Sequence, residues 1–285
     1  MDLAELWDYD RPGVSEQRFR AALATATDTD ALVLRTQLAR ALGLQRRFAE
    51  ATAELDALSL DDAGPLVRTY AELERGRVLN SSGDPNAARP HFLAALAEAE
   101  AAGLDALAAD AAHMMAIVES GAAQIPWAER ALAIAGASDD PRARRWIGSV
   151  SNNLGWTLHD LGRNEEALAV WQRALAFREE QGDVGPLNIA RWTVARGLRS
   201  LGRYEEALAI QLELAEKVDS DGYVQEELGE LMLALGRPDE ARPHFARAHE
   251  VLSADEWLAG SEPDRLARLA ELGRTPGEAD SSPGS

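Results

Sequence analysis

His159 and Asp160 stand next to each other, and an imidazole beside a carboxylate can bind a metal ion. Two such ligands make a weak site, and the chain supplies no second motif with the further His and Asp ligands that a metal would need. His244 and His249 are five residues apart, which puts them on different faces of a helix, whereas a zinc pair prefers a spacing of four. We therefore predict no metal and no cofactor.

The sequence lacks the residues and motifs that would indicate thiol catalysis or nucleotide binding. The chain has no cysteine, which excludes disulfides, thiolate metal sites and thiol nucleophiles. It also lacks a phosphate-binding loop, a dinucleotide fingerprint and a nucleophile-elbow motif. We therefore predict that the chain is not an enzyme.

Aromatic and cationic residues form two rows with the same helical spacing. The rows are Asn152, Trp156 and His159, and Trp192, Arg196 and Arg199. Spacings of three and four place each row on one side of a helix. Arginine binds carboxylates through a planar pair of donors and tryptophan offers rigid apolar area, so the rows favour a ligand with carboxylates beside an apolar or aromatic anchor. The alternative is that the tryptophans belong partly to the core.

The rows belong to a pattern that recurs around a glycine. A leucine or methionine lies four residues before the glycine and an alanine five residues after it, and the best copies have an aromatic residue nine after it. The anchor glycines of these copies are Gly83, Gly162, Gly202 and Gly236, and small residues stand seven places before them at Gly76, Gly155, Ala195 and Gly229. The anchors are 79, 40 and 34 residues apart, which leaves room for a weaker copy between the first two. Repetition at this scale indicates a fold built by stacking copies.

This pattern resembles the tetratricopeptide repeat, a helix–turn–helix unit. The resemblance implies an all-α fold, a right-handed superhelical solenoid of about six repeats with terminal capping helices. Spacings near 40 residues are similar to the long-repeat, kinesin-light-chain-like branch of the family. The many alanines and arginines, with Lys217 as the single lysine, indicate a GC-rich genome, and we expect a bacterial protein.

Repeat boundaries follow from the anchors. The first copy is expected at about 29–60, where Leu42, Gly43 and Ala49 fit the pattern with one extra residue in the turn. The third is expected at about 104–136 with an altered turn. We predict a capping helix within 1–28, the array over 29–252, a second cap within 253–274, and a disordered tail over 275–285 that is rich in Pro, Gly and Ser. The capping helices themselves are expected at Gly13–Thr25 and Ser261–Gly273.

Local signals support these helices. Each anchor glycine is expected to take the left-handed conformation that ends the first helix of its repeat. Prolines stand where helices should begin, at Pro85, Pro141, Pro186 and Pro263. No stretch alternates apolar and polar residues long enough to indicate a sheet.

The repeats make further positions equivalent to the two rows. These positions hold Arg40, Arg77, Asn80 and His113, and near the C-terminal end they hold Glu226, Glu227 and Glu230. By the resemblance, they line the concave groove. The predicted partner groove therefore comprises Arg77, Asn80, His113, Asn152, Trp156, His159, Trp192, Arg196 and Arg199.

Charge and hydropathy limit the partners. The formal net charge of −19 argues against non-specific binding of nucleic acids, which requires clustered Lys and Arg. No apolar run is long enough to cross a bilayer, and the first residues lack the basic and apolar regions of a signal peptide. We expect a soluble, cytoplasmic protein.

Two functions fit these observations. The first is a protein–protein interaction scaffold or adaptor that binds a peptide or extended protein segment in the groove, with an acidic segment that carries an apolar anchor as the partner. The second is a ligand- or peptide-sensing regulatory protein that acts through a partner chain. Since the sequence has no basic DNA-binding domain, we favour the scaffold.

Overall fold

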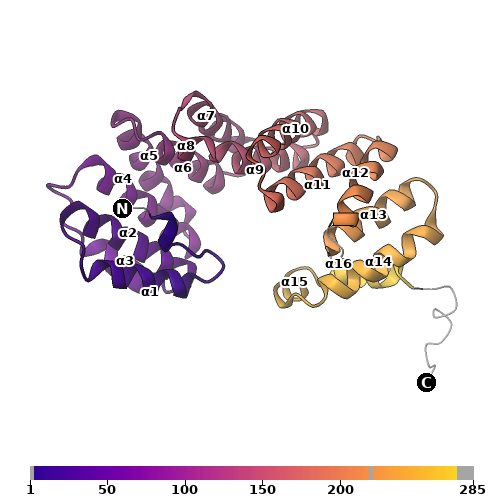
Figure 1. The fold of residues 1–285 in the computed structure, drawn as a ribbon, viewed down its shortest axis with the longest axis horizontal. Coiled ribbons are helices and arrows are strands. Elements are labelled where there is room, and N and C mark those ends of the chain that lie inside the picture. The colour runs from indigo at the N-terminus through magenta and orange to yellow at the C-terminus, as the bar shows by residue number, and fades with distance from the viewer. Residues whose placement is uncertain (1–2, 218–220, 275–285) are drawn as a thin grey trace, which may run out of the picture. The chain divides into compact units, whose positions relative to one another are not determined.

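The chain folds into helices joined by turns, as Figure 1 shows for the computed structural model, which describes residues 3–217 and 221–274. The prediction of an all-α fold is confirmed. Contacts divide the chain into two compact units, Met1–Leu161 (unit 1) and Gly162–Ser285 (unit 2), and each is described by itself. The tail predicted for 275–285 lies outside the described residues.

Unit 1 is a stack of helical hairpins. Its elements are the 3-10 helix η1 (Ala4–Leu6), α1 (Pro12–Leu23), α2 (Asp28–Leu44), α3 (Phe48–Asp56), α4 (Pro65–Ser81), α5 (Pro85–Ala101), α6 (Asp105–Val118), the 3-10 helix η2 (Gly121–Ala123), α7 (Gln124–Ala137), α8 (Pro141–Arg144) and α9 (Trp146–Asp160). The first helices of successive hairpins, α2, α4, α6 and α9, form one layer, and α3, α5 and α7 pack against them as a second layer. The helix expected at Gly13–Thr25 is α1, which packs on α2.

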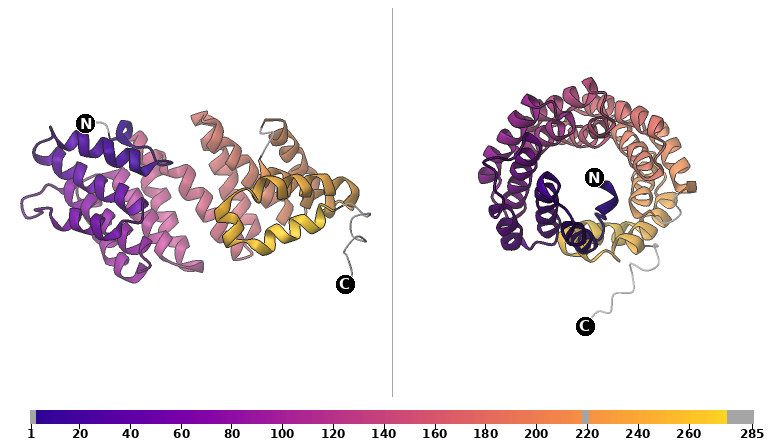
Figure 2. Two further views of the ribbon diagram at one scale, coloured as in Figure 1. Left: turned by 90° about the horizontal axis from the view of Figure 1, so that it is seen from below. Right: turned by 60° about the vertical axis from the view of Figure 1, so that its left-hand side comes forward.

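Unit 2 repeats this arrangement. Its helices are α10 (Asn164–Gln181), α11 (Val184–Ser200), α12 (Tyr204–Lys217), α13 (Gly222–Ala234), α14 (Pro238–Leu252), α15 (Glu256–Ser261) and α16 (Pro263–Leu272). Figure 2 gives two further views of the paired helices in each unit. The helix expected at Ser261–Gly273 is α16, which packs on α14. In both units we call the side of the first helices that faces away from the second helices the inner face.

The anchor glycines take the left-handed conformation that the sequence predicts. Their φ angles are 100° at Gly83, 74° at Gly162, 74° at Gly202 and 73° at Gly236. Each lies in the short turn between the two helices of a hairpin, where a side chain would be strained.

The first hairpin has a different anchor from the one expected. Between α2 and α3 the left-handed residue is Arg46, with a φ of 61°, and not Gly43, which lies inside α2. Counting from Arg46 places Leu42 four residues before the anchor and Ala51 five after it, as in the other repeats. The expected alignment on Gly43 and Ala49, with an extra residue in the turn, is therefore wrong.

Ion pairs at the starts of the second helices support the alignment of the first hairpin on Arg46. The residue after each of four anchors is an arginine that pairs with a glutamate three residues further on: Arg47 with Glu50, Arg163 with Glu166, Arg203 with Glu206, and Arg237 with Glu240. Hydrogen bonds from these arginines lower the pKa of each glutamate. Exposed pairs of this kind contribute little stability, but they mark equivalent positions.

A glycine in the first helix makes room for an aromatic ring from the second. A Cβ placed on Gly229 would lie 2.7 Å from the ring of Phe245, and one placed on Gly76 would overlap the ring of Phe92 in the same way. Both phenylalanines are fully buried. In these two hairpins, the glycine seven places before the anchor is thus required by the phenylalanine nine places after it.

Replacing Gly76 by alanine should lower the free energy of unfolding of unit 1 by about 1–3 kcal/mol, because the added methyl group overpacks against Phe92. The matched control is Gly136→Ala in α7, where no atom lies within 4 Å of the added carbon. That change should be neutral or stabilising by up to about 1 kcal/mol, since alanine favours helix. Urea unfolding followed by circular dichroism measures both. Equal midpoints for the two variants would contradict the packing described here.

Candidate binding surface

The inner face of unit 1 carries a buried network of charges. Glu74 on α4 is fully buried and accepts a hydrogen bond of 2.5 Å from Arg77 Nη1, while Arg77 Nη2 donates to Asp110 on α6. Arg40 Nη1 on α2 lies 3.9 Å from Glu74 Oε1. Burial raises the pKa of Glu74, and the attraction of Arg77 and Arg40 only partly offsets this rise. The network connects three consecutive first helices.

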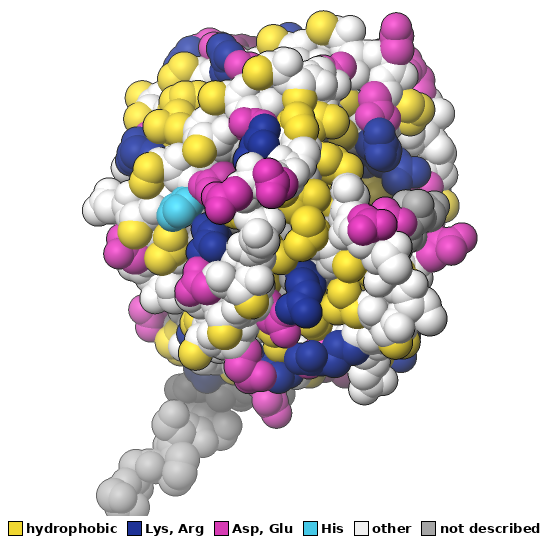
Figure 3. Space-filling view, turned by 90° about the vertical axis from the view of Figure 1, so that its left-hand side faces the viewer, with side chains coloured by type: hydrophobic (Ala, Val, Ile, Leu, Met, Phe, Trp, Pro, Cys, Tyr) yellow, Lys and Arg dark blue, Asp and Glu magenta, His cyan; other side chains and the backbone are white. Residues whose placement is uncertain are grey.

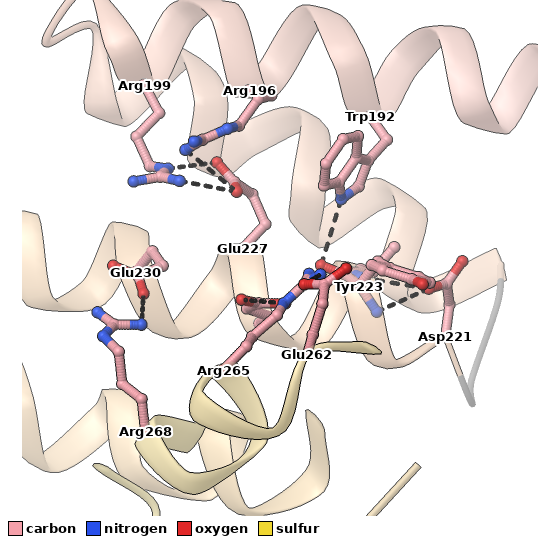
Figure 4. Close-up of polar contacts among 12 residues, drawn as sticks. Trp192, Arg196, Arg199, Asp221, Tyr223, Glu227, Glu230, Glu262, Arg265 and Arg268 are labelled. Atoms are coloured by element: carbon pink, nitrogen blue, oxygen red, sulfur yellow. Dashed lines mark hydrogen bonds and ion pairs between the residues drawn. The ribbon is translucent and has the colours of Figure 1, made fainter. Parts of the chain in front are cut away.

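Unit 2 holds a second network, drawn in Figure 4. Arg199 on α11 donates to both carboxylate oxygens of Glu227 on α13, and Arg196 Nη1 lies 3.9 Å from Glu227 Oε2. Burial raises the pKa of Glu227 more than Arg199 lowers it. Trp192 Nε1 donates to the backbone oxygen of Tyr223 at 3.2 Å, so three of the predicted residues contact the next first helix.

The two networks use equivalent positions. Glu74 and Glu227 each lie nine residues before their anchors, and Arg40 and Arg196 each lie six residues before the anchor of the preceding repeat. The nearest nitrogen–oxygen distance is 3.9 Å in both pairs. The inner faces of both units are therefore built around a buried carboxylate that faces an arginine of the preceding repeat.

Two of the acidic residues near the C-terminal end, Glu226 and Glu230, pair with arginines of α16. Arg265 binds Glu226 through Nε at 3.1 Å and Glu262 through Nη1 at 3.0 Å, and Arg268 binds Glu230. The guanidinium of Arg265 also lies 5.2 Å from the centroid of the Tyr223 ring. The acidic character expected at this end is thus balanced by the closing helix at Glu226 and Glu230 and by Arg199 at Glu227 (Figure 4).

The other predicted residues lie on the first helices of unit 1. The ring of His113 on α6 is 5.3 Å from that of Trp146, and burial lowers its pKa. On α9 the rings of Trp156 and His159 meet edge to face at 5.5 Å. Asn152 Nδ2 donates to Asn153 Oδ1 at 3.4 Å, and Asn80 is half-buried on α4. The row on α9 and the row on α11 belong to different units.

Exposed apolar side chains accompany the charges on the inner face of unit 2. Ile189 lies three residues before Trp192 on the same side of α11 and is 59% exposed. Tyr223, at the start of α13, is 41% exposed. Trp192 lies one turn from Ile189 and donates to the backbone of Tyr223, so these three residues form an apolar strip next to Arg196. Ile189 was not among the residues predicted from the sequence.

The inner face of unit 1 contains a groove of about 330 Å³. Its walls include Arg40, Tyr70, Asp110 and Trp146, which come from α2, α4, α6 and α9. Burial, together with the nearby charges of Glu74 and Asp110, raises the pKa of Tyr70. Glu74, Asp110 and Tyr70 were not predicted from the sequence. Glu74 lies three residues before Arg77 and Asp110 three before His113, so helical spacing could have placed both carboxylates on the same face.

Two of the histidines join the helices of one hairpin. His91 Nδ1 lies 2.7 Å from Glu72 Oε2, and His244 Nδ1 lies 2.7 Å from Gln225 Oε1, each joining a second helix to the first helix of its hairpin. His159 Nδ1 is 3.8 Å from Asp160 Oδ1. In the part of the chain that the structure describes, no group of three or more His, Cys, Asp and Glu side chains could hold a metal ion.

Charge of both signs is interspersed over the face drawn in Figure 3, where Asp and Glu lie beside Lys and Arg. Among the described residues, no helix is both long and apolar enough to cross a membrane.

This chain is similar to known repeat proteins both in sequence and in structure. Residues 149–180, which include most of α9 and α10, match the family model of the tetratricopeptide repeat. One similar structure is a signal transduction ATPase with numerous domains (STAND) from Pyrococcus horikoshii, which has a tetratricopeptide repeat sensor. It superposes with a TM-score of 0.70 at 13% identity, over 90% of this chain and 41% of that one. The fold is that of the tetratricopeptide repeat proteins.

Two further structures share the tetratricopeptide repeat fold of this chain. The apo form of RapI matches with a TM-score of 0.71 and 13% identity over 95% of this chain and 79% of that one. NprR in complex with its cognate peptide NprX matches with a TM-score of 0.54 and 16% identity over 98% and 84%. No curated protein sequence matches this chain.

Proposed function

We propose that this tetratricopeptide repeat protein is a non-catalytic scaffold that binds a peptide or an extended protein segment along its inner faces. The observation that carries the proposal is the strip on α11 and α13, where exposed Ile189 and Tyr223 share one face with Arg196 and Arg199. Tyr and Arg are enriched among residues that dominate binding energy. The peptide complex of NprR, which shares the fold, supports the same use of this architecture.

The ligand chemistry follows from how the arginines are held. Arg196 and Arg199 face the buried Glu227, yet their side chains remain 26% and 20% exposed. A guanidinium has five donors in a planar fork, so one edge can bind Glu227 while another binds a ligand carboxylate. Ile189 and Tyr223 supply the adjacent apolar contact. The partner we propose is an acidic segment with an apolar or aromatic anchor, contacting Trp192, Arg196 and Arg199 in unit 2.

The residues predicted in unit 1 form a second candidate surface, which belongs to that unit alone. Arg77, Asn80, His113, Asn152, Trp156 and His159 all lie on first helices. We assign the chain to a bacterial, long-repeat branch of the family and to the cytoplasm, with no nucleic-acid partner. The second candidate function is a ligand- or peptide-sensing regulator that acts through a partner chain. Its support is the likeness to the repeat sensor of the STAND protein.

A capture experiment tests the proposed face. Tagged wild-type protein is incubated with native lysate, and retained proteins are identified by mass spectrometry. Ile189→Glu should reduce capture of the specific partner at least about tenfold, because it places a charge in the apolar strip and repels an acidic segment. The matched control is Leu212→Glu on the second helix α12, where Leu212 is 45% exposed. Loss with both variants, or with Leu212→Glu alone, would place the site elsewhere.

Ile189 is a better position for this test than Arg196. Replacing Arg196 by glutamate would set a second carboxylate against the buried Glu227 and would perturb the fold as well as the ligand contact. Ile189 has no part in the charge network, so its replacement reports on binding.

A further inference from the structure

The segment Leu3–Tyr9 packs against the inner face of unit 1, although it is not part of a repeat hairpin. Leu3, Leu6 and Trp7 pack against the buried core that α2 forms with its neighbours. Trp7 Nε1 donates to Gln37 Oε1 at 3.2 Å, three residues before Arg40 on the same side of α2. The segment also forms one wall of the 330 Å³ groove.

Its aromatic residues contact the arginine of the first repeat. The rings of Trp7 and Tyr9 are stacked, with centroids 4.6 Å apart and planes 2° from parallel. The guanidinium carbon of Arg40 lies 5.5 Å from the Trp7 centroid and 5.6 Å from the Tyr9 centroid, a cation–π arrangement. Arg40 is the first-repeat equivalent of Arg196. The segment therefore covers the same position of the inner face that we propose binds a partner in unit 2.

The segment lies at the edge of the core, and none of its residues is fully buried. Each of residues 3–9 is half-buried or exposed, and Tyr9 is 58% exposed. It is joined to α1 by a hydrogen bond of 2.7 Å from the amide of Asp8 to Ser15 Oγ. Trp7 also meets the buried ring of Phe19 on α1 edge to face, with centroids 5.0 Å apart. Because none of residues 3–9 is fully buried, the segment can leave the face at a lower free energy than a repeat helix can.

The chemistry of the segment matches the ligand proposed above. Its sequence, Leu-Ala-Glu-Leu-Trp-Asp-Tyr, alternates carboxylates with leucines and aromatic rings. We propose that residues 3–9 are an internal ligand, which reversibly occupies the first-repeat part of the inner face and is exchanged for a partner segment that carries an aromatic pair flanked by carboxylates. This proposal rests on the proposed function in naming the class of partner.

Competition with a free peptide tests the internal ligand. A tethered segment acts at a local concentration on the order of millimolar, so it should block a free peptide of the same sequence. The probe is a fluorescein-labelled peptide of residues 2–11, titrated with full-length protein and followed by fluorescence anisotropy. The Trp7→Ala/Tyr9→Ala variant should bind it at least about tenfold more tightly than the wild type does.

Two controls make this result specific. Adding Arg40→Lys to that variant keeps the positive charge near Glu74 but removes the planar guanidinium, and should weaken peptide binding at least about fivefold. Trp257→Ala removes an aromatic residue that is 71% exposed on α15 and should bind the peptide as the wild type does. A labelled peptide with alanine in place of its tryptophan and tyrosine should not bind.

Equal binding of the peptide by wild type and the Trp7→Ala/Tyr9→Ala variant, or binding by neither, would overturn the proposal. If the double variant fails to fold, hydrogen exchange of the wild type decides. The amides of Trp7 and Asp8 should exchange at least about 100-fold faster than those in the middle of α2, and equal protection would make the segment a fixed part of the fold. Partner binding in unit 2 is tested separately by the capture experiment with Ile189→Glu. The proposed function and the internal ligand can therefore fail independently of each other.

Discussion

Replacing Arg77 by alanine is expected to lower the free energy of unfolding of unit 1 by about 3–5 kcal/mol. The side chain of Arg77 is 13% exposed and lies between Glu74 and Asp110, whose side chains are 0% and 7% exposed. Its loss leaves two carboxylates buried without their main partner, and an uncompensated buried charge is costly. Urea unfolding monitored by circular dichroism measures the change.

The control for this prediction is Arg203→Ala. Arg203 also pairs with a glutamate, but both side chains are well exposed, at 44% and 59%. Solvent screens such a pair, so the unfolding midpoint should stay at the wild-type value. If Arg77→Ala were as mild as Arg203→Ala, the buried network of unit 1 would not be a stabilising feature of the fold.

Replacing Leu269 by alanine is expected to cost unit 2 about 2–5 kcal/mol. Leu269 is fully buried and, together with Leu266, packs α16 onto the cluster of α14 that includes Phe245 and Leu252. The end of a repeat stack must be covered by a helix with a polar outer side, because the last apolar face would otherwise contact water. The variant should also aggregate at lower temperature than the wild type, which light scattering detects.

Leu212→Ala is the matched control for the closing helix, since Leu212 is 45% exposed on α12 and leaves no cavity when shortened. It should change the unfolding midpoint little. A similar loss of stability in both variants would show that Leu269 has no special role in covering the last hairpin.

The hairpins could be predicted from the sequence because each is defined by contacts between two helices that follow one another in the chain. The glycine in the turn, the small residue before it and the aromatic residue after it satisfy one local geometry, as Gly229, Gly236 and Phe245 show. The first hairpin was misaligned because Arg46 takes a left-handed conformation that residues other than glycine seldom adopt. A pattern that requires glycine selects Gly43 instead.

The binding surface was less predictable because its contacts join different repeats. Helical spacing placed Arg196 and Arg199 on one face, but it could not show that Glu227, about 30 residues later, holds them in place. Glu74 went unselected for the same reason. Residues 3–9 have no repeat and no long periodicity, so only the folded chain shows Trp7 and Tyr9 stacked against Arg40.

Site-specific photo-crosslinking tests the central claim, binding on the inner face, most directly. A benzophenone amino acid is placed at Ile189 on the inner face or at Leu212 on the second helix α12, two exposed apolar positions in the same unit. Irradiation in native lysate should attach a partner segment at Ile189, with acidic residues beside an apolar or aromatic anchor, and nothing specific at Leu212. A specific adduct at Leu212 with none at Ile189 would contradict the proposed binding face.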